Sequence, residues 1–232
     1  SPRHALPASP ATVSRRPPLA PRTTTPRPVG PESSGPEVLA GFDDLDGVEL
    51  AELSLDSLDI GGGRALRDCL VHSCRALEVA AASVELDGCL VTGCDLPAVE
   101  APRSRVRRTE IRDTRLGSVV AHDAVWRGVR LVRCRIGYLD LRAADLRDVL
   151  LEECQVDELD LMGARAERVA LPGTVLARLD VNAAAMRDVD LRGQATARVD
   201  GVTGLRGATL GEEQVVALAS VLAAELGIRV LD

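Results

Sequence analysis

Six cysteines are the residues of this chain whose chemistry is easiest to imagine, because paired thiolates bind zinc. They are Cys69, Cys74, Cys89, Cys94, Cys134 and Cys154. The familiar zinc spacing is tighter than that of the two closest pairs, with a knuckle turn between the thiolates. Cys134 and Cys154 also continue the same spacing of twenty, which a four-ligand site does not explain. We therefore predict buried free thiols in a reducing cytoplasm, and no metal site.

The remaining reactive residues do not form a catalytic set. The three histidines are His4, His72 and His122, and no nucleophile, base and acid stand at a recognisable spacing. Gly61-Gly62-Gly63 lacks the following Lys-Ser/Thr and helix start that a phosphate-binding loop needs. We predict no catalytic residue and no cofactor, and hence a protein that is not an enzyme.

The elements that position these side chains repeat every five residues. A small or aliphatic residue stands at every fifth position from Leu66 to Gly201, with almost no interruption. A second series of small or β-branched residues runs two positions ahead, and the other three places are mostly polar. A period of five fits neither an α-helix nor a flat strand. It predicts short extended sides joined by turns.

Sorting the second series by steps of twenty separates it into ladders, each with its own size class. These ladders are Val79, Val99, Val119, Leu139, Leu159, Leu179; Val84, Ser104, Ala124, Ala144, Ala164, Ala184; Cys74, Cys94, Thr114, Cys134, Cys154, Thr174; and Cys69, Cys89, Thr109, Val129, Val149, Val169. A bare five-residue period would not require this sorting. The sequence therefore predicts a coil of twenty residues with four sides.

Several quintets resemble the A(D/N)LXX unit of the pentapeptide repeat family. The best matches are Ala144-Asp145-Leu146-Arg147-Asp148, Leu159-Asp160-Leu161, Leu179-Asp180-Val181 and Val189-Asp190-Leu191. The resemblance covers roughly residues 45–210. It implies an all-β solenoid, a right-handed quadrilateral parallel β-helix of about eight coils. The chain has 28 arginines and no lysine, which indicates a GC-rich, actinobacterial-like bacterial source.

Composition divides the chain into three regions. Residues 1–36 hold ten of the thirteen prolines and five arginines against one glutamate, a net charge of +4. Because the whole chain carries −7, the remainder carries −11. We expect 1–36 to be a disordered tail, since it has little apolar surface to bury. Residues 37–210 form the predicted β-helix, and 211–232 follow with a different period.

The five-residue phase shifts by one residue at two places. Leu45, Leu50 and Leu55 stand one residue out of phase with Leu66, and the extra residue falls in Gly61-Gly62-Gly63. A second shift crosses Gly201-Val202-Thr203-Gly204. Glycines allow a chain to bulge without strain, so we expect each shift to be absorbed locally.

The last region is predicted to be an amphipathic helix that caps the β-helix, followed by a short strand at 228–231. Glu212 and Glu213 stand in its first turn and Gly227 just past its end. Apolar residues also occupy part of the opposite face, and the resemblance implies a twofold dimer through this region. The candidate cap and dimer residues are Val215, Val216, Leu218, Ala219, Leu222 and Leu226.

Four aspartates, which we call the acidic column, are spaced by twenty and could face a partner: Asp140, Asp160, Asp180 and Asp200. One interpretation is structural, because aspartates at this position of the repeat bond to nearby backbone groups. The other follows from the resemblance. Some family members imitate DNA, bind DNA gyrase and protect it from quinolones, and carboxylates about 5 Å apart imitate duplex phosphates.

A basic band in the middle of the chain speaks against DNA mimicry: Arg103, Arg105, Arg107, Arg108, Arg112 and Arg115. Arg107, Arg127 and Arg147 also share one column. We therefore favour a protein-interaction scaffold with an unknown partner, and keep a gyrase modulator as the alternative. No run is long enough to span a membrane. We expect a cytoplasmic protein whose folded part does not bind nucleic acid directly.

Overall fold

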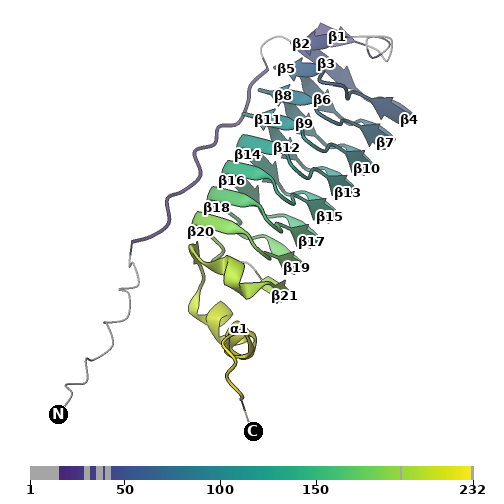
Figure 1. Cartoon of the computed structure of the whole chain (residues 1–232). Coiled ribbons are helices and arrows are strands. Elements are labelled where there is room, and N and C mark those ends of the chain that lie inside the picture. Colours follow the sequence, from purple (N-terminus) through teal and green to yellow (C-terminus); the bar gives the residue numbers. More distant parts are fainter. Residues whose placement is uncertain (1–15, 29–31, 35–38, 40–42, 194, 231–232) are drawn as a thin grey trace, which may run out of the picture.

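The inward residues of the five-residue pattern build stacked, parallel coils (Figure 1). The computed structural model describes residues 16–28, 32–34, 39, 43–193 and 195–230. Its strands pair in parallel with a step of twenty residues, so that Leu116 lies beside Ile136 and Ile136 beside Val156. All three are buried. The predicted four-sided parallel β-solenoid is confirmed.

Within the described residues, fourteen strands form one sheet that bends around two sides of the solenoid. They are β1 (Glu32–Ser34), β2 (Asp44–Asp46), β3 (Val48–Ala51), β5 (Ala65–Arg67), β6 (Leu70–His72), β8 (Glu85–Asp87), β9 (Leu90–Thr92), β11 (Arg105–Arg107), β12 (Glu110–Arg112), β14 (Val125–Val132), β16 (Asp145–Glu152), β18 (Arg165–Ala170), β20 (Ala185–Asp190) and β22 (Ala208–Thr209).

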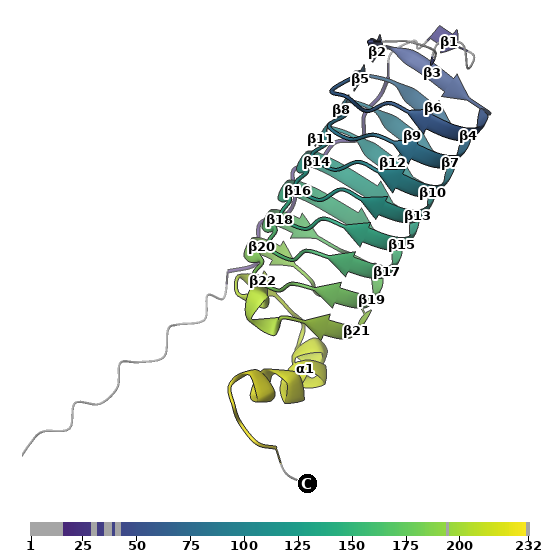
Figure 2. The same ribbon diagram turned by 45° about the vertical axis from the view of Figure 1, so that its right-hand side comes forward.

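Eight strands of six residues each, which we call the long strands, form the second sheet. They are β4 (Ser54–Asp59), β7 (Arg75–Ala80), β10 (Asp95–Glu100), β13 (Arg115–Val120), β15 (Arg135–Asp140), β17 (Gln155–Asp160), β19 (Val175–Asp180) and β21 (Ala195–Asp200). A 3-10 helix, η2 (Val202–Leu205), and one α-helix, α1 (Glu212–Glu225), follow the last long strand. Helix α1 lies at the C-terminal end of the solenoid (Figure 2).

Three of the four corners of a coil are made by a residue in the left-handed region. In the coil from 145 to 164 these are Asp148, Glu153 and Gly163, with φ of 57°, 53° and 68°. The fourth corner falls inside the long strand β17 and needs no such residue. Each left-handed residue turns the chain from one side of the coil to the next. The two inward-facing residues of each side therefore recur every five residues.

Both predicted phase shifts are present. Ser54 pairs with Arg75, a step of twenty-one, whereas Ala65 pairs with Glu85, a step of twenty. Gly62 and Gly63, which lie between them, both have positive φ (79° and 83°), a conformation that glycine adopts without cost.

At the other end the step falls to nineteen, because Val189 pairs with Ala208. Here η2 replaces a left-handed corner and uses one residue fewer. A Cβ at Gly204 would come within 1.8 Å of the Val181 carbonyl oxygen, so this turn requires glycine.

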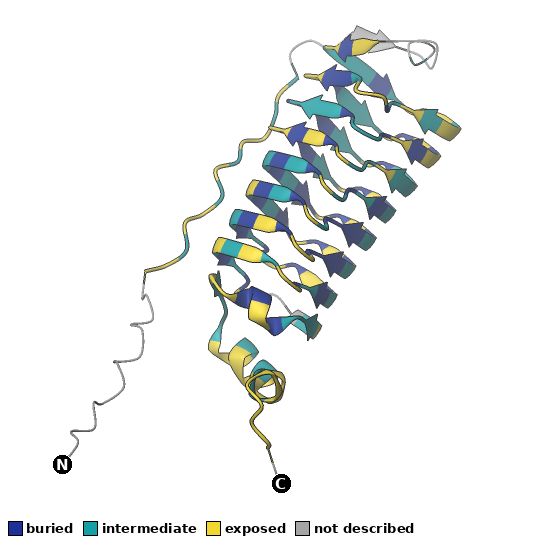
Figure 3. Cartoon of the chain, viewed as in Figure 1, coloured by how far each residue is buried: buried dark blue, intermediate teal, exposed yellow. Residues whose placement is uncertain are grey.

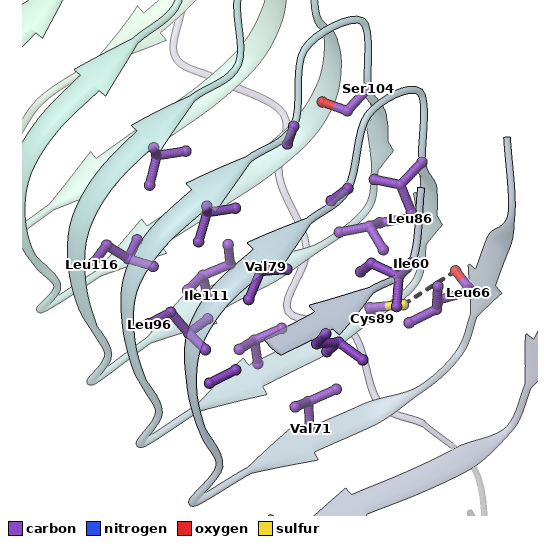
Figure 4. A pocket seen from close by; sticks show the side chains of 18 of the residues that line it. Ile60, Leu66, Val71, Val79, Leu86, Cys89, Leu96, Ser104, Ile111 and Leu116 are labelled. Atoms are coloured by element: carbon purple, nitrogen blue, oxygen red, sulfur yellow. Dashed lines mark hydrogen bonds between the residues drawn. The ribbon is translucent and has the colours of Figure 1, made fainter. Parts of the chain in front are cut away.

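The N-terminal coils enclose an apolar cavity of about 180 Å³ inside the tube. Figure 4 shows side chains that line it, among them Val79, Leu96 and Leu116. Cys89 lies at its wall and donates from Sγ to the Leu66 carbonyl oxygen at 3.2 Å. All six cysteines are buried and free, as predicted.

The N-terminal region differs from the disorder expected for residues 1–36. Residues 16–28 run as an extended segment along the solenoid (Figures 1 and 2), and Glu32–Ser34 pairs with β3 as strand β1. Composition alone missed this, because the bonds that hold the segment come from residues more than a hundred positions away. The prediction for residues 1–15, 29–31 and 35–36 lies outside the described residues.

Candidate interaction surfaces

The acidic column lies where four successive long strands end. Asp140 pairs with Asp160, Asp160 with Asp180, and Asp180 with Asp200, so the four residues stack one coil apart. Adjacent strands lie about 4.8 Å apart, which is the spacing expected from the sequence. The structure thus brings all four candidate residues onto one corner of the solenoid.

Asp140 is turned into the corner, and its carboxylate is already occupied. It is only 1 % exposed and accepts bonds from the Arg142 backbone N–H at 3.0 Å and from Nε and Nη2 of the same residue at 2.9 and 2.6 Å. Burial alone would raise the pKa of Asp140, but these bonds outweigh it and hold that pKa below its usual value.

The other three carboxylates also have internal partners. Asp160 and Asp180 each accept the backbone N–H two residues on, from Met162 and Asn182, at 2.9 Å in both cases. This Asx-type bond closes the turn at the end of the strand. The same bond recurs on another side, from the Arg192 N–H to Asp190 at 3.0 Å. The geometry therefore gives these aspartates a structural role in the corner.

Arginines neutralise both ends of the acidic column. Asp200 accepts Nε of Arg178 at 2.8 Å and Nε of Arg198 at 3.0 Å, and these two bonds lower the pKa of Asp200. Arg142 reaches Asp160 at 3.6 Å as well as binding Asp140. Three of the four aspartates are consequently ion-paired with arginine. Sequence reasoning missed these partners, although an arginine two residues after the aspartate marks the pairs at 140 and 190.

Three arginines of the basic band, Arg105, Arg108 and Arg112, pair with carboxylates. Arg105 binds Glu85 at 2.8 Å and Arg108 binds Asp87 at 2.8 Å. The predicted arginine column is present, since Arg127 pairs with Arg147. Its members bind carboxylates in turn, for example Arg147 with Glu167 at 3.1 Å. The long sides of the solenoid therefore carry mixed charge.

Helix α1 contacts the solenoid through only part of its apolar surface. Leu218 and Leu222 pack against the core, and Gln214 donates to the Leu191 carbonyl oxygen at 2.6 Å. Val215, Val216, Ala219 and Leu226 are exposed, with Val216 at 75 % and Leu226 at 76 %. Figure 3 shows α1 as the most continuously exposed element at this end. The six candidate residues thus divide between the coil and the solvent.

The short strand expected at 228–231 is absent from residues 228–230, and Leu231 lies outside the described residues. The helix closes instead with a left-handed Gly227 (φ 72°) and a bond from the Ile228 N–H to the Ala223 carbonyl oxygen at 2.8 Å. The chain then leads away from the solenoid (Figure 1), so these residues meet no strand edge.

A groove of about 750 Å³ separates α1 from the last coil. Leu179, Leu191 and Val199 line it from the solenoid, and Ala217 and Leu218 from the helix. Helix α1 therefore covers the end of the solenoid incompletely. We call this groove, together with the exposed apolar residues Val215, Val216, Ala219 and Leu226 of α1, the C-terminal patch.

Comparison with known proteins gives similarity in fold only. No family model matches the chain, and no curated protein matches it in sequence. Among solved structures, the trypsin-treated fluoroquinolone resistance protein QnrB1 is 21 % identical over 81 % of this chain and 97 % of its own, with a TM-score of 0.40. HetL, a pentapeptide repeat protein involved in heterocyst differentiation regulation from the cyanobacterium Nostoc, is 17 % identical over 73 % of this chain and 90 % of its own, with a TM-score of 0.33.

The assignment of the fold depends on the chain itself. The ladders spaced by five and twenty residues and the parallel strand pairs in four-sided coils are all observed directly. Together they give this chain the fold of pentapeptide repeat proteins.

Proposed function

We propose that this protein is a non-enzymatic interaction scaffold that assembles as a homodimer through the C-terminal patch. The observation that carries the proposal is the incomplete cover of the last coil by α1, which leaves an apolar groove beside an apolar helix face. Large apolar side chains that gather on an exposed surface mark interaction sites.

A second copy of the chain is the occupant that fits this patch best. In a twofold pair each α1 supplies Val216 and Leu226 to its partner and receives the same residues in return, so one self-complementary surface suffices.

Dimerisation would also cover the open strand edge at the C-terminal end of the solenoid. The last long strand, β21, has a pairing partner only on its β19 side among the described strands. Uncovered strand edges invite polymerisation, and a partner subunit over this end removes the edge from solvent. Sedimentation velocity over a dilution series tests whether the chain forms a closed dimer. It should show a dimer that dissociates reversibly, without longer filaments.

The positions of the histidines support the non-enzymatic part of this proposal. His72 binds Glu49 at 2.9 Å and His122 binds Asp123 at 2.8 Å, in different coils. Within the described ranges, no three His, Cys, Asp or Glu side chains gather as a metal site. The helix in the described chain is too short and polar to cross a bilayer. We place the scaffold in the cytoplasm, where six free thiols stay reduced.

A modulator of gyrase that imitates DNA is the alternative, and the stacking of Asp160, Asp180 and Asp200 favours it. The arginines on this column and on the basic band count against it. A supercoiling assay with and without a quinolone separates the two proposals. Inhibition or drug protection that weakens when the three aspartates become Asn would establish mimicry. An effect that survives those substitutions would instead place a gyrase contact elsewhere on the scaffold.

A further inference from the structure

An extended segment, residues 16–28, lies along one corner of the solenoid and runs antiparallel to the order of the coils (Figures 1 and 2). Four residues in the left-handed region form this corner, and we call them the corner track: Gly128, Asp148, Arg168 and Asp188. In the segment, Pro18, Pro21, Thr23, Pro26 and Pro28 are half-buried and the other described residues are exposed.

Backbone hydrogen bonds fix the segment to the track. The N–H of Leu19 donates to Oδ1 of Asp188 at 3.2 Å, and the N–H of Arg22 donates to Oδ1 of Asp148 at 2.9 Å. Further along, Nη1 of Arg130 donates to Oγ1 of Thr25. The contacts thus follow the segment from one end of the track to the other.

The spacing of the two N–H donors along the segment matches the spacing of the two acceptor aspartates along the track. Leu19 and Arg22 are three residues apart, and Asp188 and Asp148 are forty residues, or two coils, apart. Three residues of polyproline II span about 9.3 Å, and two coils span about 9.6 Å. A helix would advance only about 4.5 Å over three residues and would lose the second contact. The track therefore selects an extended chain that offers an N–H at every third residue.

The track holds its acceptors ready for such a chain. Arg168 binds both oxygens of Asp148 at 2.7 Å and lies between the two acceptor aspartates. Its guanidinium is the main cause that lowers the pKa of Asp148, and the N–H and charge of Arg22 lower it further against the effect of burial. Asp148 is therefore a charged, oriented acceptor. The +4 charge of residues 1–36 against −11 for the rest also favours docking.

We propose that the corner track is a peptide-binding site for an extended, proline-rich segment with backbone donors three residues apart. Its resident ligand is residues 16–28 of the same chain. This site is separate from the C-terminal patch and does not depend on the dimer. It gives the scaffold a surface that a peptide of the same chemistry occupies when the resident segment is released.

Trypsin cleavage in the full chain tests the resident contact. Arg16 and Arg27 precede proline, so Arg22–Thr23 is the cleavable bond between residues 16 and 28. We expect this bond to be cut at least about tenfold more slowly than in a synthetic peptide of residues 14–30, because cleavage requires release from the track. Leu19→Pro removes one donor and keeps the segment extended, so it should raise the rate. Ala20→Pro is the control, since Leu19 keeps its N–H.

The track side is tested by Asp148→Gly with Asp188→Gly, which removes both acceptors and keeps the left-handed corner, as Gly128 already does in the same column. The control is Asp68→Gly, which stands in that column beyond these contacts. Cleavage of the wild-type chain at the peptide rate, or no acceleration in both Leu19→Pro and the double variant, would overturn the resident contact. Leu19→Pro leaves the solenoid sequence intact, so the test survives misfolding of the aspartate variants.

Binding in trans tests the site itself. A labelled peptide of residues 14–30 should bind saturably to the full-length Leu19→Pro chain, and at least about tenfold less to the wild type, whose tethered segment competes at an effective concentration on the order of 1 mM. Binding should disappear when Asp148→Gly and Asp188→Gly are added. Absence of binding to Leu19→Pro at millimolar peptide, or binding that ignores the two aspartates, would overturn the proposed site.

Discussion

Val119 and Leu139 are paired residues of adjacent strands, and between them the filling of the solenoid changes. Their ladder holds valine in the three coils before this point and leucine in the three after it. The neighbouring ladder changes in the same place, from Ala81, Ala101 and Ala121 to Leu141 and Leu161. Both smaller sets line the cavity of about 180 Å³, so we attribute the cavity to side chains that are too small for the tube.

Filling the cavity should stabilise the chain. We expect Val99→Leu to raise the free energy of unfolding by about 1 kcal/mol, because each buried methylene contributes about 0.8 kcal/mol. The matched change Leu159→Val, in the filled part of the same ladder, should cost about 1 kcal/mol. Urea unfolding measures both. Destabilisation by Val99→Leu comparable to that of Leu159→Val would show that the N-terminal coils have no space to fill.

Asp140, the most buried aspartate of the acidic column, should matter more for stability than the half-buried Asp180. Asp140→Asn keeps an acceptor but removes the charge that two atoms of the Arg142 guanidinium bind, and we expect a loss of about 1–3 kcal/mol. Asp180→Asn is the control, since Asp180 accepts bonds from Asn182 and should lose less than about 0.5 kcal/mol. Equal effects in chemical unfolding would contradict the structural role of the corner at Asp140.

Stability should fall in acid because several carboxyl groups have a lowered pKa in the folded chain. These include Asp140, Asp148 and Asp200. A carboxyl group with a lowered folded pKa stabilises fully above its unfolded pKa, near about 3.9, and loses that contribution as the pH falls through the folded value. Melting temperatures should therefore hold from neutral pH to about 5 and decline below 4. Asp140→Asn should reduce this acid-induced fall in melting temperature. An unchanged fall would show that other groups cause it.

The thiols should be inert until the solenoid opens. All six cysteines are buried, from Cys69 at 0 % to Cys74 at 8 % exposed, so a thiol reagent has little access to them. In the native chain we expect no rapid reaction with Ellman's reagent, and six equivalents after denaturation without reductant. Fewer than six equivalents would reveal a disulfide, and rapid reaction of the native chain would reveal an opening in the coils.

The repeat made the solenoid predictable, because inward packing imposes a period that few other folds share. Both phase shifts could also be located, since a one-residue change of step must be absorbed somewhere and glycine absorbs it most easily. The cavity was not predicted, although the step from Val119 to Leu139 within one ladder could have indicated it.

Other features depend on contacts that no local pattern contains. Residues 16–28 have the composition of a disordered tail, and their order comes from Asp148 and Asp188. Helix α1 is apolar on more than one face, so its period could not show that Leu218 and Leu222 face the coil while Val216 faces solvent. The ion pairs could have been found by applying the step of twenty to charges, as Arg168 and Asp148 illustrate.

The proposed dimer is tested most directly by the molar mass of the full chain in solution, measured by light scattering during size-exclusion chromatography. One chain has a mass of 24.5 kDa, and we predict twice that value for the wild type at micromolar concentration. Val216→Glu with Leu226→Glu should give the mass of one chain with an unchanged circular dichroism spectrum, because both residues are exposed within a single chain. The control, Leu77→Glu, places the same charge on an exposed apolar residue of β7 far from α1 and should stay dimeric. A wild-type mass of 24.5 kDa, or a dimer that survives both glutamates, would contradict assembly through α1.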